Sequence, residues 1–355
     1  MHQVQVSPTP PPNLLRLLEQ HLPHSLPLLR RLQFTRFPGG ITEHTRILFA
    51  SGDDSHGGGA GAAIDPTAPF AAAYVDFSRG PETEVWMYSS LESRGSEIAS
   101  PEIRTYCTTA TTTADAATPE AQRQTEVDLA IAVLRETKAQ LDAYTAAGWK
   151  REREVVLLGT FSEKLREAVV AAASSPPMAF PDVELYDKWL MRLEGLPDIP
   201  DDKVLGSVSG QGKESGETLH WTQVRREDIA MVLSRTSIPR KERTIVLLPS
   251  IALAKEDGTL VAWAFLGPDS SLTSLHCEPE YRGRGLAKAV AVKIFREHLG
   301  RYGDDGYCFA DVAPENKASQ GVCKSLGAKA AWRHSWARMD LDKSFPDMQK
   351  EQSGI

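Results

Sequence analysis

A phosphate-binding loop is predicted where an apolar strand is followed by a helix, at the residues YRGRGL (281–286). Glycines at such a turn let backbone N–H groups approach a ligand closely. The first turn of the helix adds unpaired N–H donors and a partial positive charge. Together these groups can hold a phosphate or pyrophosphate, and Arg282 and Arg284 add positive charge beside it.

The spacing of the loop excludes two common phosphate-binding motifs. The Walker pattern GxxxxGK[ST] is absent, and Lys288 stands where the dinucleotide fingerprint GxGxxG requires its third glycine. The spacing fits instead Arg/Gln-x-x-Gly-x-Gly/Ala, with Arg282, Gly285 and Ala287 at the fixed positions. Taken alone, this short pattern also fits an ordinary strand-to-helix turn with solvated arginines.

The second half of the chain predicts the elements that would position this loop. A helix is expected over 222–236 and a helix with apolar residues every four positions over 286–299. Turn residues at 256–258 and 267–269 divide the preceding segment into a meander. We expect strands at 250–255, 259–266, 271–277, 306–312 and 334–341, and a short helix at 316–328. The fold class predicted is α+β, or a three-layer α/β domain.

The first half predicts a divergent α/β domain. Residues 1–12 are rich in proline and are expected to be disordered, and residues 51–69 and 108–122 are expected to be solvated low-complexity segments. Thr160 and Glu163 have the spacing of a capping box, which predicts a helix start between them. The elements expected are helices over 14–22 and 125–146, strands over 44–50, 70–77 and 84–91, and a strand entering a helix over 151–173.

The length of 355 residues favours more than one domain. We expect a first domain over 1–175, a linker over 176–216 that includes a helix at 181–200, a second domain over 217–345 and a tail over 346–355.

Composition narrows the classes of partner and compartment. The net charge is -7, which disfavours general electrostatic binding to nucleic acid or to an anionic membrane. The four cysteines form no CxxC pair, so neither a zinc site nor a redox motif is indicated. No apolar run is long enough to span a membrane, and the N-terminus has no secretory pattern. We expect a cytoplasmic protein, and a nuclear one is equally compatible with these features.

The loop and its surroundings resemble the GNAT superfamily of N-acyltransferases. In that family an acyl-CoA pyrophosphate loop follows the fourth strand of a meander, and a further strand leads to an Asn and a helix ending in Leu-Gly-Phe. This chain has Asn316, Ser319 and Leu326-Gly327-Ala328 at the corresponding distance. The sequence EPEYRGRGL and the Asn-x-x-Ser helix are most similar to the glycine N-acyltransferase branch, strongly over 217–341 and faintly before it. The resemblance implies a central mixed, mostly antiparallel and splayed sheet, with acyl-CoA between its fourth and fifth strands.

The resemblance also implies which residues hold acyl-CoA. The backbone of the fourth strand would pair with the pantetheine and offer an N–H group to the thioester carbonyl, the loop amides would hold the pyrophosphate, and two residues near the fifth strand would contact the pantetheine arm or order the end of that strand. These residues are Leu275, His276 and Cys277 in the strand, Arg282, Gly283, Arg284, Gly285, Leu286, Ala287 and Lys288 in the loop, and Asn316 and Ser319 after the fifth strand. Asn316 has a second interpretation as a helix cap.

The catalytic residues of the family do not all have equivalents at the matching positions of this chain. The glycine-conjugating branch has a Glu on the fourth strand where this chain has Ser271. His276 is a candidate base because an imidazole titrates near neutrality, and Asp311 is a second candidate. His276 fits equally well as a structural histidine. Cys323 stands where many relatives have a tyrosine acid, and it is either a proton donor to the CoA thiolate or a small buried residue.

The sequence therefore predicts a metal-free, CoA-dependent N-acyltransferase. The expected reaction is direct attack by the amine of a small molecule or amino acid on acetyl-CoA, or on another acyl-CoA. Acetylation of a protein or peptide amine is an alternative. Because this chain has no equivalent of the relatives' Glu and Tyr, a third interpretation of its function is a catalytically silent acyl-CoA-binding module.

Overall fold

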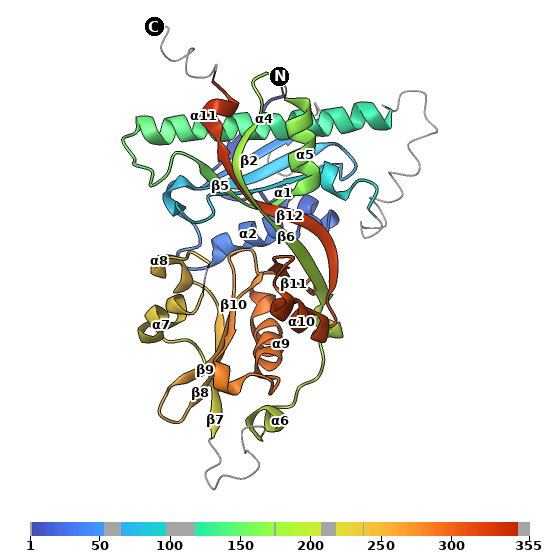
Figure 1. The fold of residues 1–355 in the computed structure, drawn as a ribbon. Coiled ribbons are helices and arrows are strands. Elements are labelled where there is room, and N and C mark those ends of the chain that lie inside the picture. The colour runs from blue at the N-terminus through green and yellow to red at the C-terminus, as the bar shows by residue number, and fades with distance from the viewer. Residues whose placement is uncertain are drawn as a thin grey trace. The chain divides into compact units, whose positions relative to one another are not determined.

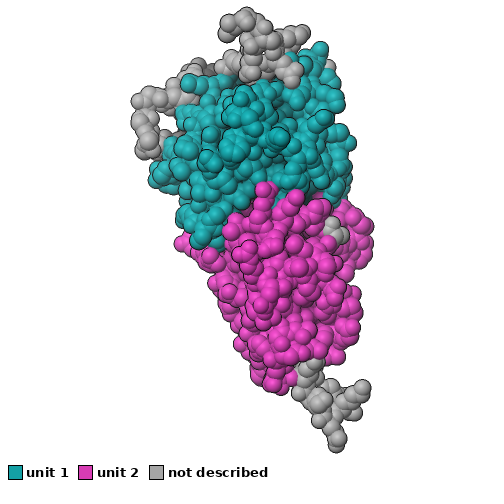
Figure 2. Space-filling view, turned by 90° about the vertical axis from the view of Figure 1, so that its left-hand side faces the viewer, with its two compact units in different colours: residues 1–185, 333–355 teal, residues 186–332 magenta. Residues whose placement is uncertain are grey.

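The computed structural model describes residues 2–52, 65–96, 118–173, 175–206, 218–236 and 238–346. Within the chain two compact units are distinguished (Figure 2). Unit 1 comprises residues 1–185 and 333–355, and unit 2 comprises residues 186–332. Most of the two predicted low-complexity segments, at 53–64 and 108–117, lies outside the described residues.

Unit 1 is a mixed sheet with helices on both faces (Figure 1). Successive residues of strand β3 face two different cores, because side chains alternate along a strand. Ala71 and Ala73 contact a core shared with helix α4, and Ala72 and Tyr74 contact a core shared with α1 and α2. The strands run in the order β1 (Gln5–Ser7), β2 (Arg46–Ser51), β3 (Phe70–Val75), β4 (Val85–Ser89), β5 (Val156–Ser162), β12 (Lys329–Asp340) and β6 (Ala179–Arg192). The helices are α1 (Pro12–Gln20), α2 (Leu26–Gln33), α4 (Pro119–Ala146), α5 (Glu163–Ala172) and α11 (Leu341–Ser344).

Unit 2 contains a four-stranded antiparallel sheet with β10 at its edge. Helix α9 (Leu286–His298) packs against β8, β9 and β10. Strand β11 (Tyr307–Val312) does not join this sheet but pairs antiparallel with residues 187–192 of β6. The sheet strands are β7 (Leu219–Thr222), β8 (Ser250–Lys255), β9 (Leu260–Leu266) and β10 (Leu272–Cys277), and the other helices are α6 (Asp201–Gly206), α7 (Ile229–Ser234), α8 (Glu242–Ile245) and α10 (Lys317–Ser325).

The two units repeat one order of elements. Unit 1 runs β1-α1-α2-β2-β3-β4-α4-β5-α5, and unit 2 runs β7-α7-α8-β8-β9-β10-α9-β11-α10. In both, a strand and two helices precede three antiparallel strands, and a helix connects these to a further strand and helix. The chain is therefore a tandem of one mixed α/β topology, a duplication that inspection of the sequence did not reveal.

The helix predicted over 181–200 is wrong, because most of this segment belongs to the long strand β6. The missed signal is an alternation interrupted once, at Asp187: Val183, Leu185, Trp189 and Met191 occupy the other positions of one face of a strand. The unit boundary falls inside this strand, between residues 185 and 186, and residues 333–355 belong to unit 1.

Three local predictions also differ from the structure. The N-terminal segment expected to be disordered contains β1, which pairs antiparallel with β2. The helix start predicted between Thr160 and Glu163 is confirmed, but the capping box is wrong, because Ser162 is the N-cap of α5 while Thr160 lies inside β5 with a φ of 50°. The helix expected over 222–236 is reduced to α7 and a preceding turn of 3₁₀ helix. The remaining predicted strands and helices of the meander region are confirmed to within a few residues.

None of the helices in the described ranges is long and apolar enough to cross a membrane.

Candidate active site

A bulge interrupts the edge strand β10. Thr273 pairs with Phe265 and His276 pairs with Trp263, so Ser274 and Leu275 together lie opposite a single residue of β9. Ser274 has a φ of 49°, in the left-handed region that side chains other than glycine seldom adopt. Bulges turn backbone groups out of the regular ladder and are frequent beside active sites. The bulge therefore presents backbone amides at the strand that the sequence assigns to the thioester.

The loop after β10 carries a run of free backbone donors. Among the described residues, the N–H groups from Gly283 to Lys288 have no hydrogen-bond partner, and Ala289 is the first to donate, to Gly285. Gly283 and Gly285 have φ values of 77° and 80°, and no atom of the described residues lies within 4 Å of a Cβ built at either position. The loop is thus open, and its donors and the start of α9 can hold a phosphate.

The two arginines beside the loop make contacts within the protein. Arg282 donates from Nε to the Cys277 carbonyl at 2.9 Å and so ties the loop to the end of β10. The guanidinium of Arg284 lies 5.3 Å from the centre of the Tyr281 ring. The residues best placed to bind an anion are therefore the backbone amides.

Strands β10 and β11 lie near each other in unit 2 as edges of two different sheets. No backbone ladder joins these two described strands: β10 pairs with β9, and β11 pairs with β6. The N–H and C=O groups along the free edge of β10 can therefore pair with an extended ligand such as the pantetheine of CoA.

A charged group of side chains surrounds His276. The imidazole stacks on the indole of Trp263 with centroids 4.6 Å apart. Its Nε2 lies 3.6 Å from Glu278 Oε2, while the other oxygen of Glu278 accepts from Arg235 Nε at 3.0 Å. Burial lowers the pKa of His276, Glu278 raises it, and Arg282 and Arg235 lower it further, so that the net shift is downward from 6.5. The imidazole is therefore neutral near pH 7 and able to accept a proton.

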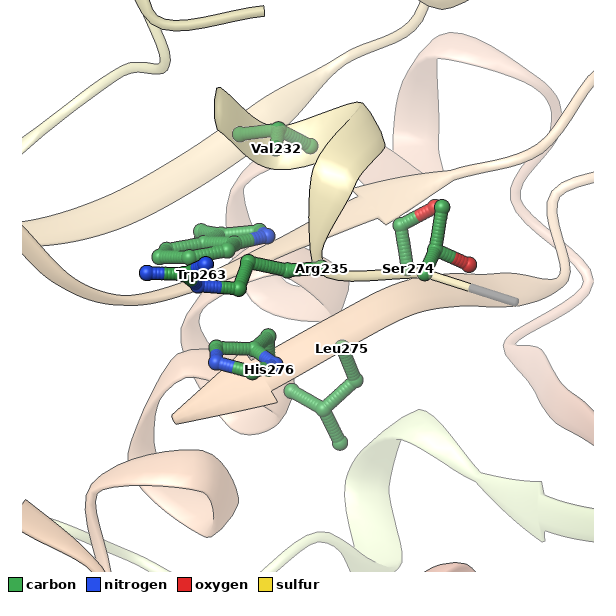
Figure 3. A pocket seen from close by; sticks show the side chains of 7 residues that line it. Val232, Arg235, Trp263, Ser274, Leu275 and His276 are labelled. Atoms are coloured by element: carbon green, nitrogen blue, oxygen red, sulfur yellow. The ribbon is translucent and has the colours of Figure 1, made fainter. Parts of the chain in front are cut away.

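A small pocket of about 40 Å³ opens beside the bulge. Arg235 reaches from the end of α7 toward Trp263, and His276 lies below it on β10 (Figure 3). The pocket is lined by Val232, Arg235, Thr236, Trp263, Ser274, Leu275 and His276. The bulge and the candidate base thus face one cavity.

Comparison with known proteins identifies the family. The model of the N-terminal domain of acyl-CoA N-acyltransferase verG matches residues 2–189, more than half of the chain. The chain belongs to the acyl-CoA N-acyltransferase family. A model of FR47-like proteins matches residues 252–337, which include β10 and the loop. No curated protein sequence matches the chain.

One solved structure has a similar fold over nearly the whole chain, and two others are less similar. A Drosophila protein structure is similar with a TM-score of 0.53 and 16% identity, over 94% of this chain and 98% of that one. A tandem GNAT protein from the clavulanic acid biosynthesis pathway matches with a TM-score of 0.45 and 11% identity, over 95% and 98% of the two chains. A GCN5-related N-acetyltransferase from Sphaerobacter thermophilus matches with 0.44 and 12%, over 95% and 96%.

In this acyl-CoA N-acyltransferase, Asp311 is engaged elsewhere. Its carboxylate lies 2.7 Å from Lys188 Nζ, and both groups are buried at facing positions of β11 and β6. Burial raises the pKa of Asp311 to about 6, against the effect of Lys188. His276 lines the pocket beside the bulge, and Asp311 is not among the described residues that line it.

Cys323 is buried in α10, and burial raises the pKa of its thiol to about 12. Proton transfer from so weak an acid to a thiolate of ordinary pKa, about 8.5, is uphill by several pKa units. The structure therefore counts against Cys323 as the acid. Asn316 is the N-cap of α10 and accepts from the Ser319 N–H at 3.0 Å, so the capping interpretation holds for the structure as described.

Sequence reasoning missed the two residues that complete the group around His276. The side chain of Glu278 is only 17% exposed and contacts His276 and Arg235. Arg235 had no assigned role. Ser271, at the position of the relatives' Glu, is buried and donates to Asp269 at 2.6 Å in the turn before β10.

Within the described residues, no group of three or more side chains is arranged to bind a metal ion.

Proposed function

We propose that this acyl-CoA N-acyltransferase transfers an acetyl group from acetyl-CoA to the amine of a small molecule or amino acid. One arrangement carries the proposal: in unit 2 the bulged free edge of β10 leads directly into the run of free amides from Gly283 to Lys288. The edge and bulge suit a pantetheine thioester, and the amides suit a pyrophosphate. The resemblance to the glycine-conjugating branch supports an amino-acid acceptor.

In the proposed reaction the amine nitrogen attacks the thioester carbonyl carbon. The carbon–nitrogen bond forms, the carbon–sulfur bond breaks, and the amine proton passes to the His276 imidazole. Glu278, 3.6 Å from Nε2, stabilises the imidazolium. A backbone amide of the bulge stabilises the developing oxyanion. The CoA thiolate leaves and takes a proton from the imidazolium or from water.

Release of CoA thiol by the purified chain, measured with acetyl-CoA and a panel of amines, tests the proposal. We expect turnover with small amines, with the acetylated product identified by mass spectrometry. His276→Ala is expected to lower kcat by about 10²–10⁴-fold with little change in acetyl-CoA binding. Tight binding without turnover on any small amine or peptide indicates a silent binding module. Turnover on peptides alone indicates a protein acetyltransferase, and absence of acetyl-CoA binding refutes all three.

A further inference from the structure

Among the described residues that line the pocket beside the bulge, Arg235 has the one permanently charged side chain. The other residues in this lining are apolar or uncharged, because His276 is neutral near pH 7. Arg235 is 47% exposed and extends along the pocket (Figure 3). A pocket of this kind orients its ligand by its few polar groups, so Arg235 indicates what the acceptor carries.

The position of the Arg235 guanidinium is fixed, yet its terminal nitrogens are available. Nε donates to Glu278 Oε1 at 3.0 Å, which anchors the group. Nη1 and Nη2 have no partner among the residues that the structure describes. Two parallel N–H donors on the end of a guanidinium match the two oxygens of a carboxylate.

Charge balance points to the same ligand. In the resting pocket the Glu278 carboxylate offsets the Arg235 guanidinium. When His276 takes the amine proton, the group of three gains one positive charge. Arg282 and the guanidinium of Arg240, which donates to Thr273 Oγ1 just before the bulge, add further positive potential. A carboxylate on the acceptor offsets this charge, whereas a simple amine does not.

The spacing fits a short amino acid. Arg235 and His276 contact the two oxygens of a single carboxylate, that of Glu278, so the two side chains are separated by the width of one carboxylate group. An acceptor with its amine and carboxylate separated by one or two carbons reaches both groups, and the cavity of about 40 Å³ favours a small one. We infer that the acceptor is a small amino acid whose carboxylate is bound by Arg235. This inference rests on the proposed function.

Paired acceptors test the inference, each amino acid being compared with its decarboxylated amine: glycine with methylamine, β-alanine with ethylamine, phenylalanine with phenethylamine. We expect kcat/KM to be at least tenfold higher for the small amino acids than for their amines. Arg235→Gln is expected to lower the ratio of kcat/KM for each small amino acid to kcat/KM for its amine about 10–100-fold, because only the amino acid loses a partner for its carboxylate. Measurement on the pH plateau of each variant removes the effect of a changed His276 pKa.

Arg226→Gln is the matched control. Arg226 lies just before α7 with its side chain 84% exposed, does not line the pocket, and should be silent for both members of each pair. Thermal melting of each variant establishes that it is folded. An equal loss for both members in Arg235→Gln, or no preference in the unsubstituted protein, overturns the inference while acetyl transfer still stands. Absence of turnover with every amine instead defeats the proposed function, and the inference with it.

Discussion

At the scale of single residues, the chemistry depends on how His276, Glu278 and Arg235 share charge. His276 stacks on Trp263, which fixes the plane of its ring. Burial lowers its pKa, and Glu278 provides the main opposing effect. Burial would raise the pKa of Glu278 itself, but Arg235 and His276 outweigh this and hold it below the usual value. The carboxylate is therefore ionised when the imidazole has to accept a proton.

The first prediction concerns the pH dependence of the reaction. Below the pKa of His276 the imidazole is protonated and cannot act as a base, so kcat/KM should fall as the pH drops through a value below 6.5. Glu278→Gln removes the carboxylate that raises this pKa and should move the acid limb to lower pH. Arg235→Gln removes a positive charge that lowers the pKa of His276 and should move the acid limb to higher pH. Rate profiles with one fixed amine measure both shifts; an acid limb identical in all three proteins would exclude His276.

The second prediction separates Cys323 from the proton transfer. With a thiol pKa near 12, the side chain serves as a buried packing group rather than as an acid. Cys323→Ala should therefore change kcat by less than about threefold and lower the unfolding free energy modestly, by about 1 kcal/mol. Steady-state kinetics and denaturant titration give the two quantities. A loss of kcat of a hundredfold or more in a folded variant would restore Cys323 as the acid.

At the scale of elements, the loop between β10 and α9 depends on backbone conformation. Gly285 is the N-cap of α9 with a φ of 80°, and no side chain in the described part of the chain caps this helix start. The amides of the first turn are consequently left free for a ligand.

The third prediction tests this loop. Gly285→Ala has room for its methyl group, but the left-handed φ is unfavourable for alanine by about 1 kcal/mol. The loop should relax and turn its amides away, weakening CoA binding about tenfold while thermal stability changes little. Gly300→Ala is the matched control, because its Cβ also meets no atom within 4 Å and its φ is not positive. Calorimetric titration with CoA compares the two; equal affinities would contradict the assignment of the loop.

The elements that sequence could predict are those specified by neighbouring residues. The meander from β8 to β10 follows from turn residues at 256–258 and 267–269, and the phosphate-type loop follows from glycine spacing. The alternation along β6 is a local signal, but it does not reveal the partners β11 and β12, which lie more than a hundred residues away in the chain. The bulge at Ser274 was missed for a related reason, since pairing with β9 determines it. Arg235 and Glu278 meet only after both segments have folded.

At the scale of the whole molecule, the chain repeats one topology, but the two copies differ at the start of the helix that follows the three antiparallel strands. In unit 2, α9 begins at a glycine with free amides. In unit 1, the equivalent helix α4 begins with Pro119, and the Thr118 side chain accepts from the Ala121 N–H. The start of α4 is thus occupied by its own cap. This difference supports placing the proposed acyl-CoA site in unit 2.

The fourth prediction follows from the assignment of residues 333–355 to unit 1. Met339 pairs with Val156 of β5 and is fully buried in the unit 1 core, although it stands near the end of the chain. Met339→Ala should lower the unfolding free energy by about 2–5 kcal/mol. Hydrogen exchange should then show the greater loss of protection in β4 and β5, whose core contains this side chain, than in β8 and β9. Ile294→Ala, in the buried face of α9, is the reciprocal control and should expose β8 and β9 first. If Met339→Ala instead reduced hydrogen-exchange protection in β8 and β9 before β5, β12 would belong to unit 2. Each half of the chain would then contain all the strands of its own sheet.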